Sequence, residues 1–254
     1  MKELAFDALT VRIGRDIDEM ATDAALTAGA AVRDAIAARG RANVMLATGN
    51  SQLVFLEALV QVPGIDWGRV RAFHMDEYVG ISPAHPASFQ RYMRERVAAR
   101  VPFEAFHYLG DDDADPEAEA ARYEALLRTH PLDLCCAGIG ENGHLAFNDP
   151  PVADFDDPRA VKVVALEPAS RLQQVGEGHF AALDDVPTHA ITVTIPALLA
   201  ASCLLVIVPE ARKARPVHDA LYGPITTACP ASILRRQANA TLYLDAESSA
   251  LLEP

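Results

Sequence analysis

Short apolar runs alternate with helix-like segments along most of the 254 residues. Runs of about five apolar residues predict strands over 43–47, 70–73, 132–137, 161–166, 190–194, 204–208 and 240–244. Helices are predicted over 17–39, after Asn50, and over 88–99, 116–129 and 211–221, with Ser88 as an N-cap. Strands and helices that alternate in this way are typical of a mostly parallel sheet with helices on both faces. The pattern therefore predicts an α/β fold, organised as a single Rossmann-like domain over residues 1–254.

Composition limits where such a protein works. Although half of the residues are hydrophobic, no apolar run approaches the 18 or so residues that span a bilayer. The N-terminus lacks the charged and apolar regions of a signal peptide. Cys135, Cys136, Cys203 and Cys229 have no metal-ligand spacing and fall mostly in apolar strands, which favours buried thiols. We expect a cytoplasmic protein with no metal site.

The formal net charge of −13 argues against nucleic acid as a main partner. The same charge does not exclude a small anionic ligand, provided that positive potential is built locally. Helix N-termini and a few Lys or Arg side chains can supply that potential.

The segment 138–150 is the richest in candidate chemistry. Glycine recurs at 138, 140 and 143 directly after an apolar strand, where the chain must turn tightly or approach a ligand closely. Within the same turn lie a histidine, two carboxylates and two asparagines, namely His144, Glu141, Asp149, Asn142 and Asn148. The carboxyl end of a parallel strand is where open α/β sheets bind their ligands. Taken alone, the segment could also be a Gly-rich loop with incidental polar residues, and His144 a packed core histidine.

Three further strand ends carry candidate residues. Thr48, Gly49, Asn50 and Ser51 open a helix whose free N–H groups suit a phosphate, although the segment is neither a Walker A loop nor G-x-G-x-x-G. The alternative is that its hydroxyl groups only cap the helix.

Asp76 and Glu77 directly follow another strand, and adjacent carboxylates there are costly unless they are exposed or employed. One of them could face a pocket, where Asp76 would be a general base, while the other caps or pairs. At the third strand end, Arg212, Lys213 and Arg215 crowd a helix start, where cations oppose the helix dipole. Either an anionic ligand offsets this unfavourable interaction with the helix dipole, or these residues lie on the surface and bind no ligand.

Together these segments resemble the glucosamine-6-phosphate deaminase/isomerase family, which is related to the 6-phosphogluconolactonases. Residues 73–80 resemble the family motif F-N-M-D-E-Y-V-G, and residues 138–150 resemble G-[VI]-G-x-[DN]-G-H-I-A-F-N-E-P. The resemblance runs from about residue 10 to about residue 250 with the motifs in order. The lactonases carry G-H-T-A-S-L-F where this chain has G-H-L-A-F-N, which favours the deaminase side.

The resemblance implies conversion of an amino-sugar 6-phosphate to a ketose 6-phosphate and ammonia, without metal or cofactor. By this resemblance Asp76 moves a proton between C2 and C1 of the open-chain sugar, and His144 assists ring opening. Asn142 and Asp149 orient His144 and set its charge. Unperturbed histidine already titrates near neutrality, as a ring-opening acid requires.

The resemblance also assigns the phosphate to the loop of Thr48, Gly49, Asn50 and Ser51 and to Lys213, which matches the family's phosphate lysine. Ser88 is a less certain member of the lining.

Three positions depart from the family pattern. Asn142 stands where some members carry aspartate, which should alter the pH profile. Asp149 stands in place of the usual glutamate and is one methylene shorter, so we expect it to reach His144 through a loop shift of about 1 Å or through a water. The family's phosphate arginine, which follows A-N-S, falls on Gly176, and Arg171 is the candidate replacement.

Several alternatives stay open at this stage. The substrate could be galactosamine 6-phosphate, or the protein could be a 6-phosphogluconolactonase. A non-catalytic sugar-phosphate sensor is a further possibility, against which the acidic balance and the lack of a DNA-binding appendage count. A homo-oligomer is possible, and allosteric control is a weak expectation.

Overall fold

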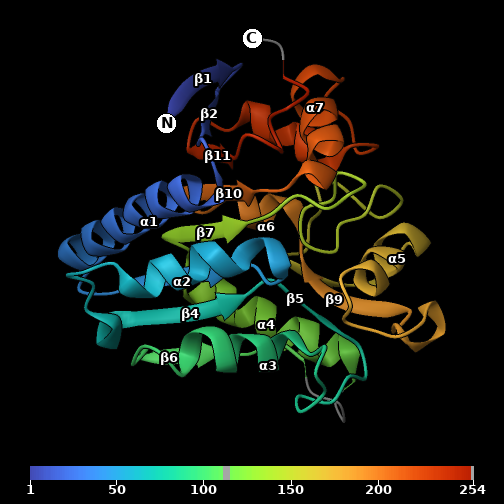
Figure 1. Cartoon of the computed structure of the whole chain (residues 1–254). Helices are drawn as coiled ribbons and strands as arrows, with labels where there is room; N and C mark the ends of the chain where they lie inside the picture. The colour runs from blue at the N-terminus through green and yellow to red at the C-terminus, as the bar shows by residue number, and fades with distance from the viewer. Residues whose placement is uncertain (111–114, 253–254) are drawn as a thin grey trace.

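The computed structural model describes residues 1–110 and 115–252 and is built around one large sheet (Figure 1). This eight-stranded sheet has the order β1-β2-β11-β10-β7-β3-β4-β6. Its strands are β1 (Lys2–Phe6), β2 (Leu9–Ile13), β11 (Ala240–Leu244), β10 (Cys203–Val208), β7 (Leu134–Ala137), β3 (Ala42–Leu46), β4 (Val70–His74) and β6 (Ala105–His107). Neighbouring strands from β2 to β6 are parallel, and only the β1–β2 pair is antiparallel. The predicted α/β fold with a mostly parallel sheet is confirmed.

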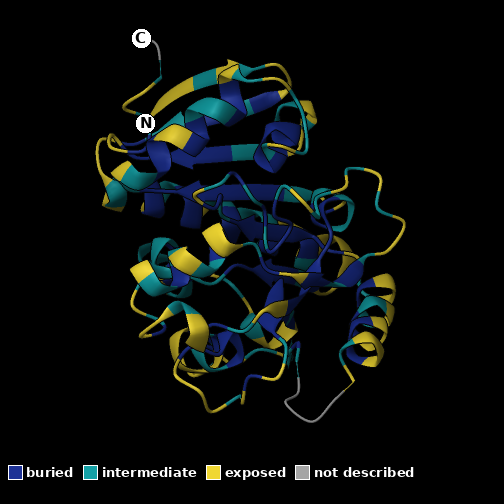
Figure 2. Ribbon diagram, turned by 90° about the vertical axis from the view of Figure 1, so that its right-hand side faces the viewer, coloured by how far each residue is buried: buried dark blue, intermediate teal, exposed yellow. Residues whose placement is uncertain are grey.

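Helices cover both faces of this sheet, as the hydrophobic pattern predicts. The core on one face includes side chains of α1 (Ile17–Arg39), α2 (Leu53–Gln61) and α3 (Phe89–Met93) with its π-helical extension Arg94–Ala98. The core on the other face includes side chains of α4 (Pro116–Thr129), α6 (Ile195–Leu199) and α7 (Ala214–Tyr222). Figure 2 shows the strands between these layers as mostly buried. Burial on both faces explains why the central strands read as continuous apolar runs.

Adjacent residues of a strand face opposite sides of the sheet, which separates two cysteines. Cys135 packs in the core beneath α4 and α7, whereas Cys136 packs in the core beneath α1 and α2. Both thiols are buried and free, as predicted. Burial raises the pKa of Cys135 to about 12, so this thiol stays protonated.

A second, three-stranded sheet lies beside the first and was not predicted. It consists of β5 (Asp76–Tyr78), β9 (His189–Val193) and β8 (Val161–Ala165), in that order and all antiparallel. The runs 161–166 and 190–194 are strands as predicted, but their assignment to the parallel sheet is wrong. Apolar periodicity identifies a strand but not the strand with which it pairs. In this structure β5, which begins two residues after the end of β4, pairs with β9.

Three strands of the large sheet were also missed. β1 and β2 form an edge hairpin with many exposed positions, and β6 has only three residues, so none of the three strands has a clear apolar run.

The predicted helix cap at Ser88 is confirmed, because Ser88 accepts a hydrogen bond from the Arg91 N–H at 3.4 Å. The remaining helical segments are α5 (Pro168–Gly176) and the 3₁₀ turns Asn50–Gln52, Trp67–Arg69, Leu183–Asp185, Ala211–Lys213 and Pro230–Arg236. Across residues 1–110 and 115–252, no helix is both long and apolar enough to cross a bilayer.

We expect the packing of α2 to dominate stability on its face of the sheet. Phe55 is fully buried in that core, so Phe55→Ala should lower the free energy of unfolding by about 3–5 kcal/mol. Leu26→Ala on α1 is the matched control, because Leu26 is 52% exposed and its loss should change the free energy by less than about 0.5 kcal/mol. Urea unfolding followed by circular dichroism measures both, and equal values would contradict the assigned core.

Candidate active site

A cavity opens at the carboxyl edge of the large sheet. Four of its walls are the segments that follow β3, β4, β7 and β10, which are adjacent strands in the order β10-β7-β3-β4. Helices α3 and α5 supply the remaining wall. The lining residues are Ala47, Thr48, Gly49, Ser51, Met75, Asp76, Phe89, Gly138, Ile139, Gly140, His144, Ala146, Phe147, Gln173, Gln174, Glu177 and Lys213. The chain reverses its winding between β3 and β7, which is where open α/β sheets form ligand crevices.

Asp76 presents a buried carboxylate to this cavity. It is the first residue of β5, is 6% exposed, and has no hydrogen-bond or ion-pair partner for its side chain in the described part of the chain. The Nδ1 atom of the buried His74 lies 3.0 Å from the Asp76 carbonyl oxygen, and His74 Nε2 accepts from the Leu109 N–H at 2.8 Å. This pairing makes His74 a neutral donor that holds the Asp76 backbone. Burial, with the nearby Glu77 carboxylate, raises the pKa of Asp76 to about 8.

Glu77 is turned away from the cavity and caps α3. Its carboxylate accepts hydrogen bonds from the Ser88 hydroxyl at 2.8 Å and from the Phe89 and Gln90 N–H groups at 3.2 and 2.9 Å. Burial still raises the pKa of Glu77 to about 7. One carboxylate therefore faces the cavity while its neighbour caps a helix, as the sequence suggested. Ser88 is held by this cap and is not among the lining residues.

The loop after β3 and Lys213 form the opposite end of the cavity. Gly49 has a φ of 104°, a conformation that favours glycine, and Thr48, Gly49 and Ser51 line the cavity. Lys213 is 3% exposed and, within the described residues, its ammonium group has no hydrogen-bond or ion-pair partner. Burial lowers the pKa of Lys213 to about 8. Asn50 differs from the prediction, because its amide donates to the Glu177 carbonyl at 3.3 Å and does not line the cavity.

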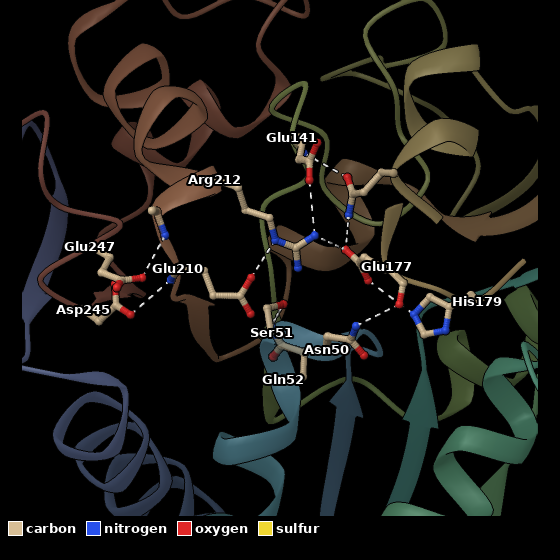
Figure 3. A network of polar contacts seen from close by, with 12 residues as sticks. Asn50, Ser51, Gln52, Glu141, Glu177, His179, Glu210, Arg212, Asp245 and Glu247 are labelled. Atoms are coloured by element: carbon tan, nitrogen blue, oxygen red, sulfur yellow. Dashed lines mark hydrogen bonds and ion pairs between the residues drawn. The ribbon is translucent and has the colours of Figure 1, made fainter. Parts of the chain in front are cut away.

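The other cations near Lys213 are paired with protein carboxylates. Arg212 contacts Glu141 at 3.2 Å, Glu177 at 2.8 Å and Glu210 at 2.6 Å, and Figure 3 shows its guanidinium group between them. Burial alone would raise the pKa of Glu177, but hydrogen bonds and neighbouring cations lower it to about 2. Arg215 pairs within its own helix. Protein carboxylates therefore pair with Arg212 and Arg215. Lys213 is the cation of this cluster that lines the cavity.

His144 is held by a direct contact with Asp149. His144 Nδ1 lies 3.0 Å from Asp149 Oδ1 and 3.1 Å from the Ser170 hydroxyl, which also hydrogen-bonds Asp149. This direct contact excludes the expected bridging water, whereas the expected loop shift stays a prediction. Asn148 explains the close approach, because its buried amide donates to the Leu145 and Val193 carbonyls at 2.8 and 2.9 Å and clamps the turn.

Asn142 supports the histidine loop and does not touch the imidazole. Its side-chain oxygen accepts from the His144 backbone N–H at 3.2 Å, while its NH₂ group donates to Asp149 at 3.0 Å and to Glu167 at 2.7 Å. An amide suits a place between two carboxylates because it supplies two donors. Burial opposes ionisation of Asp149, but hydrogen bonds from His144, Ser170 and Asn142 hold its pKa below the ordinary value.

Arg171 is the candidate that the structure excludes from the cavity. Its guanidinium group donates to the Leu183 and Val186 carbonyls at 2.6 and 2.9 Å, and it is not among the lining residues. Helix direction explains the error, because Arg171 is next to Ser170 and consecutive residues of a helix point to different sides.

The residues that sequence reasoning missed lie on α5. Ser170 and Gln174 of α5 and its C-cap residue Glu177 are three or four residues apart, so they lie on one side of the helix. Gln174 and Glu177 line the cavity, and Ser170 contacts His144. Pro168 at the first turn was the available signal, since proline favours that position. Elsewhere, among the described residues, no group of three or more His, Cys, Asp or Glu side chains could hold a metal ion.

Comparisons with known proteins show the family of this chain. The family model "Glucosamine-6-phosphate isomerases/6-phosphogluconolactonase" matches residues 15–243. A glucosamine-6-phosphate deaminase of Exiguobacterium sibiricum is 38% identical over 207 residues, which are 82% of this chain and 80% of that protein. One of Listeria monocytogenes is 33% identical over 84% of this chain and 89% of its own length.

Solved structures show the same fold. A monomeric glucosamine-6-phosphate deaminase superposes with a TM-score of 0.85 at 27% identity, covering 95% of this chain and 99% of its own. A 6-phosphogluconolactonase from Shewanella baltica superposes at 0.73 with 18% identity, covering 92% and 96% of the two chains, which shows the fold alone.

The fold and the cavity define an α/β protein whose site is assembled from loops at the carboxyl ends of parallel strands. This chain belongs to the family of glucosamine-6-phosphate isomerases and 6-phosphogluconolactonases.

Gly140 sets the position of the His144 ring. A Cβ atom at Gly140 would lie 2.1 Å from the imidazole, so Gly140→Ala should push the ring away from Asp149 and destabilise the fold by about 1–3 kcal/mol. Gly176→Ala is the control, because a Cβ there meets nothing within 4 Å. Crystal structures and thermal unfolding of both variants check this expectation. An unmoved imidazole in Gly140→Ala would contradict it.

Proposed function

We propose that this protein is a glucosamine-6-phosphate deaminase, which converts glucosamine 6-phosphate and water to fructose 6-phosphate and ammonia. One observation carries the proposal: the buried carboxylate of Asp76 and the buried ammonium of Lys213 line one cavity without a protein partner. Buried charges are normally paired, so these two groups are matched to a ligand that brings both a proton to abstract and an anion. The curated relatives with this activity cover most of the chain.

The phosphate suits the Lys213 end of the cavity. The loop of Thr48, Gly49 and Ser51 opens a helical segment, whose first N–H groups lack acceptors within the helix. An ammonium group together with such N–H groups binds a dianion through charge-assisted hydrogen bonds. Local positive potential of this kind offsets the repulsion expected from a net charge of −13.

His144 suits the ring-opening step. Asp149 accepts from Nδ1, which leaves Nε2 to exchange a proton with the ring oxygen of the bound sugar. The open chain then carries an aldehyde at C1 and the amine at C2.

Asp76 suits the isomerisation that follows. Its carboxylate takes the proton from C2, which gives an enolamine, and returns that proton to C1. The product is an imine at C2. Water adds to this imine and ammonia leaves, which yields the ketose 6-phosphate. The overall change moves two electrons from C2 to C1 and requires no external oxidant or reductant.

Ammonia release tests the proposal directly. Purified protein given glucosamine 6-phosphate should release ammonia and fructose 6-phosphate in equal amounts. Asp76→Asn should lower kcat by at least about 10²–10⁴-fold, because the amide cannot accept the proton. Asp34→Asn, on the exposed side of α1, is the matched control and should retain full activity.

Three outcomes would overturn the proposal. Ammonia release that survives Asp76→Asn removes Asp76 from its role. Hydrolysis of 6-phosphogluconolactone without ammonia release makes the protein a lactonase. Binding of hexosamine phosphates without turnover makes it a sensor.

The pH dependence of kcat/KM should be bell-shaped, with a maximum near pH 8. Asp76, whose pKa is raised to about 8, is protonated and inactive as a base at lower pH, so activity should rise with pH up to that value. Lys213, whose pKa is lowered to about 8, loses its charge at higher pH, so phosphate binding should weaken there. In Lys213→Arg the alkaline fall should disappear while the acid limb remains. The substrate's own titration affects both proteins equally, so their difference isolates Lys213. An acid limb near pH 4 would contradict the role of burial at Asp76.

A further inference from the structure

Like Asp76 and Lys213, Gln174 lines the cavity without a hydrogen-bond partner for its side chain among the described residues. It is 8% exposed. The adjacent Gln173 differs, because its oxygen accepts from the Glu141 N–H at 3.1 Å and its NH₂ group donates to Glu177 at 2.8 Å. The side chain of Gln173 is therefore held by the protein, whereas the amide of Gln174 is available to a ligand.

A glutamine amide offers both an acceptor oxygen and N–H donors, which is the combination that a sugar hydroxyl group matches. Among the described residues, the side-chain nitrogen and oxygen atoms that are fully buried without a partner do not include those of Gln174. Its amide therefore reaches the open space of the cavity, where a polar group of the ligand can meet it.

The position of Gln174 along α5 identifies which part of the ligand it meets. One turn earlier, Ser170 contacts the His144 imidazole at 3.1 Å. Three residues later, the Glu177 carbonyl accepts from Asn50, in the loop at the Lys213 end. A helix rises about 1.5 Å per residue, so Gln174 lies roughly 6 Å along the helix axis from Ser170 and roughly 5 Å from Glu177.

A hexose 6-phosphate in its open-chain form spans these two ends when C1 lies at His144 and the phosphate lies at Lys213. Its C3 and C4 hydroxyl groups then lie between them, opposite Gln174. We propose that Gln174 is a specificity-determining residue whose amide binds the hydroxyl groups at C3 and C4 and so distinguishes the C4 epimers of the substrate. This inference rests on the proposed function, because it uses the same placement of the sugar.

Binding measurements in a protein that cannot turn over its substrate test the inference. Asp76→Asn provides that parent, and Gln174→Met added to it removes the amide while keeping the side-chain length. Calorimetry with glucosamine 6-phosphate, galactosamine 6-phosphate and inorganic phosphate gives three dissociation constants for each protein. Gln61→Met in the same parent is the matched control, because Gln61 is an exposed glutamine on α2.

The expected result is selective. Gln174→Met should weaken binding of the preferred hexosamine phosphate by about 10- to 100-fold, bring the two epimers within about twofold of each other, and leave the affinity for inorganic phosphate unchanged. Gln174→Asn, whose amide is one methylene shorter, should fall between the parent and Gln174→Met. Circular dichroism of each variant checks that α5 and the fold are retained.

Each contrary result has a distinct meaning. An unchanged affinity for both sugars, or an equal loss that includes inorganic phosphate, overturns the role of Gln174 in reading hydroxyl groups. A parent that binds neither sugar overturns this inference and the proposed function together. A wild-type protein that releases no ammonia, while the epimer difference still depends on Gln174, overturns only the deaminase activity.

Discussion

The burial of unpaired charge is the constraint on which the site depends. Asp76 and Lys213 are almost fully removed from solvent, yet neither side chain makes a hydrogen bond or an ion pair within the described part of the protein. Burial shifts the pKa of both groups to about 8, from opposite directions, so each titrates near neutrality instead of at its ordinary extreme. The free energy that folding loses at these two positions is recovered when a ligand supplies the missing partners, which is typical of catalytic sites.

The rest of the site holds other groups rigidly around this pair. His74 fixes the Asp76 backbone, and the Asp149 contact fixes the orientation of the His144 ring. Asn142 lies between two carboxylates and ties the histidine turn to the start of α5. Packed and hydrogen-bonded side chains therefore hold in place the groups that face the cavity, and these groups are the ones available for chemistry.

Helix α5 connects the two ends of the cavity. Ser170 touches the imidazole, Gln174 faces the middle, and Glu177 contacts both Asn50 and Arg212 near the phosphate loop. Figure 3 shows that the Glu177 end of this wall is held by a network of side chains from several segments. A single short helix thereby sets the distance between the catalytic end and the anion-binding end, which must match the length of the sugar.

The sequence was sufficient wherever the signal was local. Runs such as 204–208 identified buried strands, Ser88 identified a helix cap, and the glycines of 138–143 identified a strand-end turn. The expected residues Thr48, Asp76, His144 and Lys213 do meet in one cavity, because the carboxyl ends of adjacent parallel strands share one edge of the sheet.

What the sequence could not determine depends on partners distant along the chain. Whether β8 and β9 joined the large sheet or formed their own was decided by pairing with β5, and periodicity carries no information about pairing. Arg171 and Gln174 are both polar residues of one helix, and only the packing of α5 turned the first toward the Leu183 and Val186 carbonyls and the second toward the cavity. The amino-acid sequence by itself therefore determined which strand ends carry the chemistry. Tertiary structure alone decided which side chains remain unpaired there, because a free polar group is defined by the absence of neighbours that only the folded chain can bring close.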